Sequence, residues 1–233
     1  DYQRLGDHVA RALKPGGFAA INIDGPVRFW RSRKIGSERS LIAFKLAIDW
    51  AERVGLRYVE HCAYVRDGAP GLFGDRWRSG WEPVHVFQRP GAAGHLDGNG
   101  FTVDPLHGGA VRRADHYRSS KGGVQKTGET RVVGDRRTIT TAERLSPVRM
   151  NDHPAPFSSF IADAFVLCYS PPGGLVCDPF MGSGTVALSC ARNGRSVIGG
   201  DLGARETDGR RWADIARENA DAIANPAQQR LFA

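Results

Sequence analysis

Two segments near the start of the chain have the hydrophobic spacing of a helix. The first runs from Tyr2 to Leu13 and stops at Pro15-Gly16-Gly17. The second runs from Leu41 to Val54, and Gly55 can adopt the left-handed conformation that closes a helix. The apolar stripe that defines this second helix contains Leu41, Phe44, Ala47, Ile48, Ala51 and Val54.

Short apolar runs next to these helices predict strands. Phe18 to Ile23 is bounded by glycine and Asp24, as expected of a buried parallel strand. Arg57 to Val65 and Val84 to Gln88 also have strand character, and a loop rich in glycine, proline and tryptophan separates them. Helices that alternate with strands in this way indicate an α/β fold.

Residues 90 to 150 differ from the sequence on either side. They are rich in Gly, Arg, Thr and Asp and show little apolar periodicity, so we predict an inserted, partly disordered lobe or long loop. Regular patterns return after this stretch and alternate helix with strand, over Phe157 to Cys168, Leu175 to Asp178, Thr185 to Asn193, Ser196 to Gly199 and from Glu206 onward.

Composition fits one soluble domain of 233 residues with a core of its own. Apolar residues make up 41% of the chain, and no apolar run is long enough to span a membrane, so we expect no membrane contact. The cysteines lack C-x-x-C spacing and sit in apolar segments, where we expect small buried side chains rather than metal ligands or disulfides. This pattern favours a reducing, cytoplasmic setting. The four cysteines are Cys62, Cys168, Cys177 and Cys190.

The positive charge of the chain is concentrated in one segment. The formal net charge is +7, and between Gly108 and Arg149 ten Lys and Arg residues face only four acidic ones. A polyanion matches this stretch, although a solvated loop with incidental charge has the same composition. The residues that we predict to contact such a polyanion are Arg112, Arg113, Arg118, Lys121, Lys126, Arg131, Arg136 and Arg137.

The segment from Leu175 to Thr185 combines an apolar strand, an acidic residue and a glycine loop that opens a helix. Such a turn lies at the carboxyl edge of a parallel sheet, where open α/β folds bind ligands. Gly182 and Gly184 permit close approach of the backbone to a ligand. A carboxylate at Asp201, after the next strand, can accept hydrogen bonds from both ribose hydroxyls of a nucleoside.

Gly182 to Ala187 also satisfies the G-x-G-x-x-[GA] pattern of NAD-binding folds, so an NAD-dependent oxidoreductase is a competing interpretation. Asp178 argues against it, because a carboxylate placed before the glycines repels a pyrophosphate and suits a cationic amino acid moiety. A Walker-type phosphate loop is excluded, because no Lys follows Gly184.

Two motifs in the expected order resemble one enzyme family. Asp178-Pro179-Phe180-Met181-Gly182-Ser183-Gly184-Thr185 resembles the D-P-F-x-G-S-G-T cofactor motif of the amino-directed (N4-cytosine or N6-adenine) DNA methyltransferases. His153-Pro154-Ala155-Pro156-Phe157 is similar to their H-P-A-x-F-P element. The resemblance also extends to Leu13-Lys14-Pro15-Gly16-Gly17 with the strand that follows, and more loosely to Trp81-Glu82-Pro83-Val84-His85-Val86-Phe87. The basic stretch then falls where such enzymes keep a variable target-recognition region.

This resemblance implies an α/β fold, the Rossmann-like sheet of S-adenosylmethionine-dependent methyltransferases with a basic inserted loop or lobe. The cofactor motif near the C-terminus matches the permuted subgroup of the family. Residues 1–90 would form the catalytic-side half, 91–150 the target-recognition insertion and 151–233 the cofactor-binding half.

The resemblance also assigns the cofactor-binding residues. The methionine part of S-adenosylmethionine would be surrounded by Asp178, Pro179, Phe180, Gly182, Ser183, Gly184 and Thr185. Asp201 would bind the ribose, and His153, Pro154 and Phe157 would close the pocket from the side. The start of a helix explains His153 and its neighbours equally well.

The family's catalytic motif, (D/N/S)-P-P-(Y/F/W), has no match in this sequence. Ser170-Pro171-Pro172-Gly173 lacks the aromatic residue and directly precedes the cofactor strand, so we interpret it as a structural turn. In the permuted order we expect the catalytic residues and one central strand upstream of Asp1. Loss of a central strand would leave two rows of backbone groups unpaired, at about 1 to 3 kcal/mol for each buried group.

The function that the resemblance implies is methylation of the exocyclic amino group of adenine or cytosine in double-stranded DNA. The target base would be flipped out of the duplex, and the reaction needs no metal. A non-catalytic DNA-binding module with the same fold, and methylation of RNA or protein, are alternatives. The target base, the recognition sequence and the oligomeric state stay open.

Overall fold

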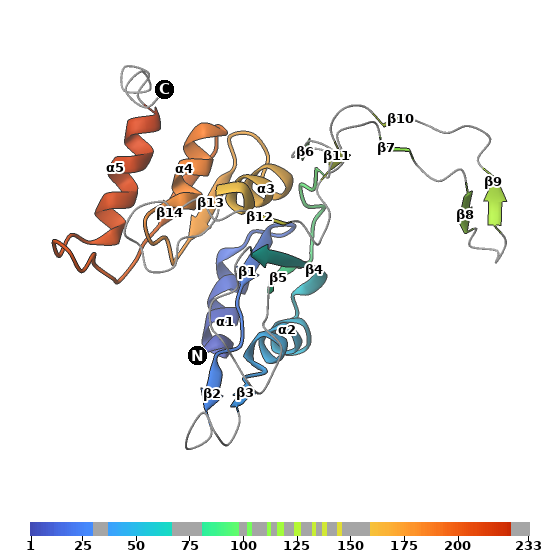
Figure 1. Ribbon diagram of the computed structural model, residues 1–233, viewed down its shortest axis with the longest axis horizontal. Helices are drawn as coiled ribbons and strands as arrows, with labels where there is room; N and C mark the ends of the chain where they lie inside the picture. The colour runs from blue at the N-terminus through green and yellow to red at the C-terminus, as the bar shows by residue number, and fades with distance from the viewer. Residues whose placement is uncertain are drawn as a thin grey trace. The chain divides into compact units, whose positions relative to one another are not determined.

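The computed structural model describes residues 1–29, 37–66, 81–97 and 159–224, and the short strands β6 to β12 between residues 102 and 145 (Figure 1). The chain divides into two compact units, of which the smaller is Gly98–Ile139. The larger unit combines Asp1–Asp97 with Thr140–Ala233. In the described part of the chain, every helix is too short or too polar to cross a membrane.

The larger unit contains a four-stranded sheet with the order β1-β5-β4-β12. Strand β5 runs antiparallel to both β1 and β4, and β12 runs parallel to β4. The four strands span Phe18–Asn22 (β1), Trp81–Gln88 (β5), Arg57–Arg66 (β4) and Arg144–Leu145 (β12). A separate hairpin joins β2 (Val27–Phe29) to β3 (Ser37–Arg39).

The remainder of the larger unit is a parallel strand pair with three helices. Strand β13 (Leu175–Asp178) pairs with β14 (Ser196–Gly199), and α4 (Thr185–Arg192) connects them. Helix α4 lies between α3 (Ser159–Tyr169) and α5 (Trp212–Ala224) and contacts both. This strand–helix–strand unit confirms the alternation predicted for this part of the sequence.

The smaller unit contains short antiparallel strand pairs. They are β6 (Thr102–Val103) with β11 (Arg137–Thr138), β7 (Val111–Arg112) with β10 (Val132–Val133), and β8 (His116–Arg118) with β9 (Val124–Lys126).

An apolar core forms where α1 (Tyr2–Ala12) and α2 (Ile42–Glu52) pack on β5. Trp50 is fully buried and donates a hydrogen bond from Nε1 to the Tyr2 carbonyl at 2.9 Å. The helices approach closely at Gly6, where an added Cβ would lie 2.5 Å from the same indole nitrogen. Burial of so large a ring is worth about 2 to 3 kcal/mol or more, so Trp50 anchors this layer. The buried centre contains Leu46, Trp50, Leu56 and Phe87.

The structure confirms the second predicted helix as α2, and its packing shows which apolar positions are buried. Ala47 and Val54 of the apolar stripe pack against the core, whereas Leu41, Phe44 and Ile48 are 60%, 55% and 57% exposed. The most deeply buried residues of the helix are Ala43, Leu46 and Trp50, at spacings of three and four residues. The apolar spacing therefore predicted the helix but not the face that packs, because that face is determined by the Trp50 indole, which fits against Gly6.

Two smaller predictions also need correction. The strand from Phe18 is not a buried parallel strand, because its partner β5 is antiparallel and four of its five residues are only half-buried, with Ala20 exposed. Cys177 is exposed, because its side chain is on the outward face of β13, whereas Cys168 and Cys190 are buried as expected. Burial raises the pKa of the Cys190 thiol to about 11, which leaves it unreactive at neutral pH.

Candidate cofactor site

The predicted glycine loop connects the end of β13 to the start of α4. Gly182 and Gly184 have φ angles of 51° and 91°, in the left-handed region that glycine adopts without strain. Gly184 occupies the N-cap position of α4, and Thr185, the first residue of the helix, is buried. The loop is therefore a tight turn whose two glycines are required by its backbone conformation.

Backbone hydrogen bonds hold this loop against the residues that follow β14. The Met181 N–H donates to the Gly200 carbonyl at 3.0 Å, and the Gly200 N–H donates to the Asp178 carbonyl at 3.2 Å. Gly199 must be small, because a Cβ there would lie 2.3 Å from the Asp178 carbonyl oxygen. The ends of the two parallel strands thus position the loop.

Asp201 joins the two loops through its carboxylate. Its Oδ2 accepts a hydrogen bond from the Gly182 N–H at 2.9 Å, and its Oδ1 accepts one from the Gly203 N–H at 2.7 Å. Each carboxylate oxygen has a second lone pair for another donor. Asp201 lies two residues beyond the end of β14, where it can hold the glycine loop and still accept hydrogen bonds from a ligand.

Two carboxylates give this end of the strand pair a negative potential. Burial raises the pKa of Asp178 above its ordinary value, and the charge of Asp201 raises it further, while the hydrogen bond from the Phe180 N–H at 3.1 Å opposes the shift. An ionised carboxylate in this environment favours a nearby cation. The site is therefore suited to a positively charged ligand and unsuited to a pyrophosphate.

Large apolar side chains flank the same loops and face solvent. Phe180 is 69% exposed, and Leu202, next to Asp201, is fully exposed. These two side chains therefore offer apolar surface next to the two carboxylates, Asp178 and Asp201.

Helix α5 supports the loop from the other side. A Cβ on Gly184 would lie 2.7 Å from both Cα and Cβ of Ala216, so the loop and helix backbones are in close contact. One turn further, the Asn219 side chain donates a hydrogen bond from Nδ2 to the Ser183 carbonyl at 3.2 Å. Neither Ala216 nor Asn219 was among the predicted site residues. The available signal in the sequence was helical spacing, because these two residues lie on the same face of α5 as the buried Trp212 and Ile215.

The other predicted site residues fall partly outside the described structure. Pro179 lies in the turn between Asp178 and Phe180, and Ser183 is buried between the two glycines. His153, Pro154 and Phe157 lie outside the described residues, as do Arg113, Lys121, Arg131 and Arg136 of the predicted DNA-contacting set. The backbones of Arg112, Arg118, Lys126 and Arg137 belong to strands β7, β8, β9 and β11.

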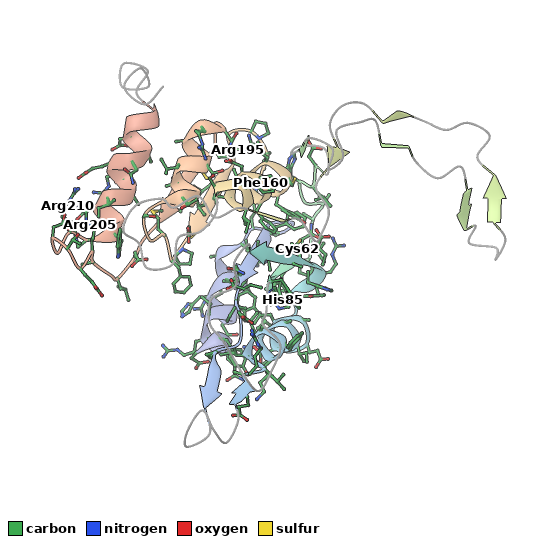
Figure 2. All side chains as sticks on the ribbon, in the orientation of Figure 1. Cys62, His85, Phe160, Arg195, Arg205 and Arg210 are labelled. Atoms are coloured by element: carbon green, nitrogen blue, oxygen red, sulfur yellow. The ribbon has the colours of Figure 1, made fainter. Side chains whose placement is uncertain are left out.

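The Ser170-Pro171-Pro172-Gly173 segment forms a turn between α3 and β13. Gly174 N–H donates to the Pro171 carbonyl at 2.8 Å. The guanidinium of Arg195, which is labelled in Figure 2, donates to the Ser170 carbonyl at 2.9 Å. Arg195 also binds the Asn193 carbonyl at the end of α4. These contacts confirm a structural turn that ties the ends of α3 and α4 together.

A sequence profile for a family described as DNA methylase matches residues 2–208 of this chain. Among curated proteins, the type II methyltransferase M.ScaI of Streptomyces caespitosus is 36% identical over 61 residues, which are 26% of this chain and 20% of that protein. The orphan methyltransferase M.BamHII of Bacillus amyloliquefaciens is 41% identical over 66 residues, 28% of this chain and 23% of that protein. The matched segments thus span under a quarter of each relative's length.

Solved structures show the same fold. The PvuII cytosine-N4-specific DNA methyltransferase matches with a TM-score of 0.60 at 16% identity, over 95% of this chain and 74% of that one. A putative DNA modification methylase from Thermus thermophilus, complexed with S-adenosyl-L-methionine, gives 0.59 at 18% identity, over 96% and 76%. The M1.HpyAVI–SAM complex gives 0.56 at 16% identity, over 93% and 80%. These similarities confirm the predicted fold class.

Proposed function

This chain belongs to the DNA methylase family, and from that premise we propose that it transfers a methyl group from S-adenosylmethionine to an exocyclic amino group of adenine or cytosine in double-stranded DNA. The observation that carries the proposal is the Asp178-to-Thr185 loop, with Asp178 and Asp201 creating a site for a cation. Two structural neighbours are complexes with S-adenosylmethionine, which is the cationic nucleoside that such a site suits.

The residues around the loop fit this cofactor. The Asp178 carboxylate suits the positive sulfonium and amino groups of the methionine part, and the Asp201 carboxylate can accept hydrogen bonds from the ribose hydroxyls. The exposed side chains of Phe180 and Leu202 offer apolar surface for the adenine ring. Gly182 and Gly184 keep side chains out of the turn. When bound, S-adenosylmethionine supplies an electrophilic methyl group on a sulfonium centre.

The contribution of this chain to catalysis is positioning. Asp201 stabilises the turn by accepting a hydrogen bond from the Gly182 N–H. The close contact of Gly184 with α5 prevents the loop from moving toward that helix. A rigid loop holds the reacting centre in one place, and correct placement of two reactants supplies much of the rate acceleration in a direct displacement. The His153, Pro154 and Phe157 side chains are proposed to close the pocket from the side.

The target base needs a catalytic loop, which we propose is carried by a further strand. Among the described residues, β1 pairs only with β5 and β13 only with β14, so each strand keeps one edge without a strand partner. Because β5 occupies one edge of β1, a strand that connects to β1 through α1 and pairs with it would lie at the free edge of β1. We propose that this strand carries the (D/N/S)-P-P-(Y/F/W) motif ahead of α1. Its absence from the protein sequence encoded there would contradict the proposal.

DNA is the proposed partner of the basic segment in the smaller unit. The residues proposed to contact phosphates or bases are Arg112, Arg113, Arg118, Lys121, Lys126, Arg131, Arg136 and Arg137. Phosphate contacts make affinity fall steeply with salt concentration, whereas base contacts make it depend on sequence. Measurement of DNA binding between low and physiological salt tests this part of the proposal.

The decisive experiment measures cofactor binding and methyl transfer together. We expect the protein to bind S-adenosylmethionine in calorimetry and not NAD, and the full-length protein to transfer labelled methyl groups to duplex DNA. Nucleoside analysis of the product then identifies N6-methyladenine or N4-methylcytosine. Cofactor binding without transfer to any DNA would favour a non-catalytic DNA-binding module, and transfer to RNA or protein instead would replace the proposed substrate.

A further inference from the structure

The peptide bond between Ser183 and Gly184 leads into the second glycine of the loop. It lies next to Gly184, whose φ of 91° shows that this residue accepts backbone angles closed to other residues. Rotation of this peptide changes only the ψ angle of Ser183 and the φ angle of Gly184. Because the residue after this peptide bond is a glycine, rotation of the peptide by about 180° costs little free energy unless hydrogen bonds oppose it.

Two hydrogen bonds hold this peptide from opposite ends. The Gly184 N–H donates to the Met181 carbonyl at 2.9 Å, within the loop itself. The Ser183 carbonyl accepts from Asn219 Nδ2 at 3.2 Å, which is a side chain of α5, 36 residues further along the chain. The Asn219 bond is thus the contact that ties the orientation of this peptide to the rest of the fold.

The position of α5 supports this role. Ala216, one turn before Asn219, is fully buried against Gly184, so the helix backbone cannot shift away without opening the core. Ser183 is only 4% exposed, and a buried carbonyl that loses its partner is destabilised by about 1 to 3 kcal/mol. The amide of Asn219 both satisfies this carbonyl and fixes its direction.

We propose that Asn219 is a positioning residue for the cofactor loop. It acts through the Ser183 carbonyl and does not contact the reacting atoms. The inference rests on the proposed function, because the loop is taken to bind S-adenosylmethionine. The Asn219 hydrogen bond raises the fraction of molecules whose loop is in the conformation that binds the cofactor. Loss of this bond therefore weakens cofactor affinity but leaves the rate of methyl transfer in the bound state unchanged.

The test replaces Asn219 with residues that differ in hydrogen bonding but not in helix compatibility. Asn219→Leu has nearly the same size and no donor, whereas Asn219→Gln keeps an amide donor on a longer side chain. Both leucine and glutamine favour a helix more than asparagine does, so a weaker α5 cannot explain a loss. Asp221→Asn, two residues away and exposed, is the matched control.

We expect the dissociation constant and the KM for S-adenosylmethionine to rise about tenfold in Asn219→Leu, with kcat unchanged, because about one hydrogen bond is lost. Asn219→Gln should recover part of the affinity, and Asp221→Asn should bind like the wild type. Affinity in Asn219→Leu equal to the wild type, or a fall in kcat without a change in KM, would overturn the proposal.

A second measurement separates this inference from the proposed function. In the protein without cofactor, amide hydrogen exchange at Gly184 should be about tenfold faster in Asn219→Leu than in the wild type, since the peptide is less restrained. If the wild type fails to bind S-adenosylmethionine, the proposed function fails while this exchange measurement still tests the role of Asn219. Unchanged exchange at Gly184 would refute the positioning role.

Discussion

The two parts of the larger unit that the structure describes most fully are stabilised by different kinds of contact. The layer of α1 and α2 on β5 is held by large apolar side chains, with Trp50 and Phe87 fully buried and their rings 5.2 Å apart. The glycine loop with α4 and α5 also buries apolar side chains, such as Trp212 and Ile215, but adds small polar residues that are buried, including Ser183, Thr185 and Ser189. Apolar packing dominates the first part, whereas in the second part hydrogen bonds in addition give the loop a defined shape.

The largest effect should come from removing the anchor of the apolar layer. Trp50→Ala leaves a cavity between α1, α2 and β5, and such changes cost about 3 to 5 kcal/mol. Because natural domains are stable by only about 5 to 15 kcal/mol, we expect a large fall in the urea midpoint followed by circular dichroism. Trp50→Phe keeps a smaller aromatic ring in the site but loses the hydrogen bond to the Tyr2 carbonyl, so it should cost much less. Equal losses in both variants would contradict the view that cavity size determines the cost.

The next effect tests the shape of the glycine loop. Gly184→Ala adds a Cβ 2.7 Å from the Cα of Ala216 at a residue with positive φ, which combines backbone strain of about 1 to 2 kcal/mol with overpacking of about 1 to 3 kcal/mol. We expect both stability and S-adenosylmethionine affinity to fall. Gly194→Ala is the matched control, because its φ is 67° but nothing lies within 4 Å of its Cβ position. If the two variants lose the same stability, close contact with α5 contributes nothing.

A third change should separate binding from stability. Asp178→Asn removes a carboxylate whose pKa burial raises, and it keeps an oxygen that accepts from the Phe180 N–H. We expect S-adenosylmethionine affinity to fall about 10- to 100-fold, since a hydrogen bond to a charged group contributes about 1.5 to 3 kcal/mol. The cofactor-free variant should be no less stable than the wild type in thermal unfolding at neutral pH.

The raised pKa of Asp178 also predicts how stability and cofactor affinity change with pH. A carboxyl with a raised pKa binds its proton more tightly in the folded protein, so its contribution to stability is lost as pH rises from 3.8 through the folded-state value. Cofactor affinity should change in the opposite direction and fall as Asp178 becomes protonated. A cofactor-free Asp178→Asn protein that melts well below the wild type at neutral pH would show that the ionised carboxylate is stabilising.

The contrast between these parts also explains which features could be predicted from the sequence. The turn at Gly182 and Gly184 could be predicted, because its positive φ angles are a local requirement that glycine meets. The hydrogen bond from Gly182 to Asp201 could not, because it joins residues 19 positions apart. The face that α2 buries depends on Gly6, which is more than 40 residues away from Trp50 in the sequence. For Asn219, the helical spacing on α5 indicated a packed face, but nothing in the sequence indicated its hydrogen bond to Ser183.

The smallest expected effect concerns the stripe that the sequence pattern favoured. Phe44 is 55% exposed, so Phe44→Gln should change the free energy of unfolding by about 0.5 kcal/mol or less, as most surface substitutions do. Leu46, two residues away on the same helix and fully buried, should lose about 2 to 5 kcal/mol when changed to alanine. Chemical denaturation of both variants at two protein concentrations compares the faces directly. The prediction is contradicted if Phe44→Gln loses as much free energy of unfolding as Leu46→Ala and if this loss grows with protein concentration. Another molecule would then cover the exposed apolar stripe of α2 in solution, and the stripe would be a buried surface after all.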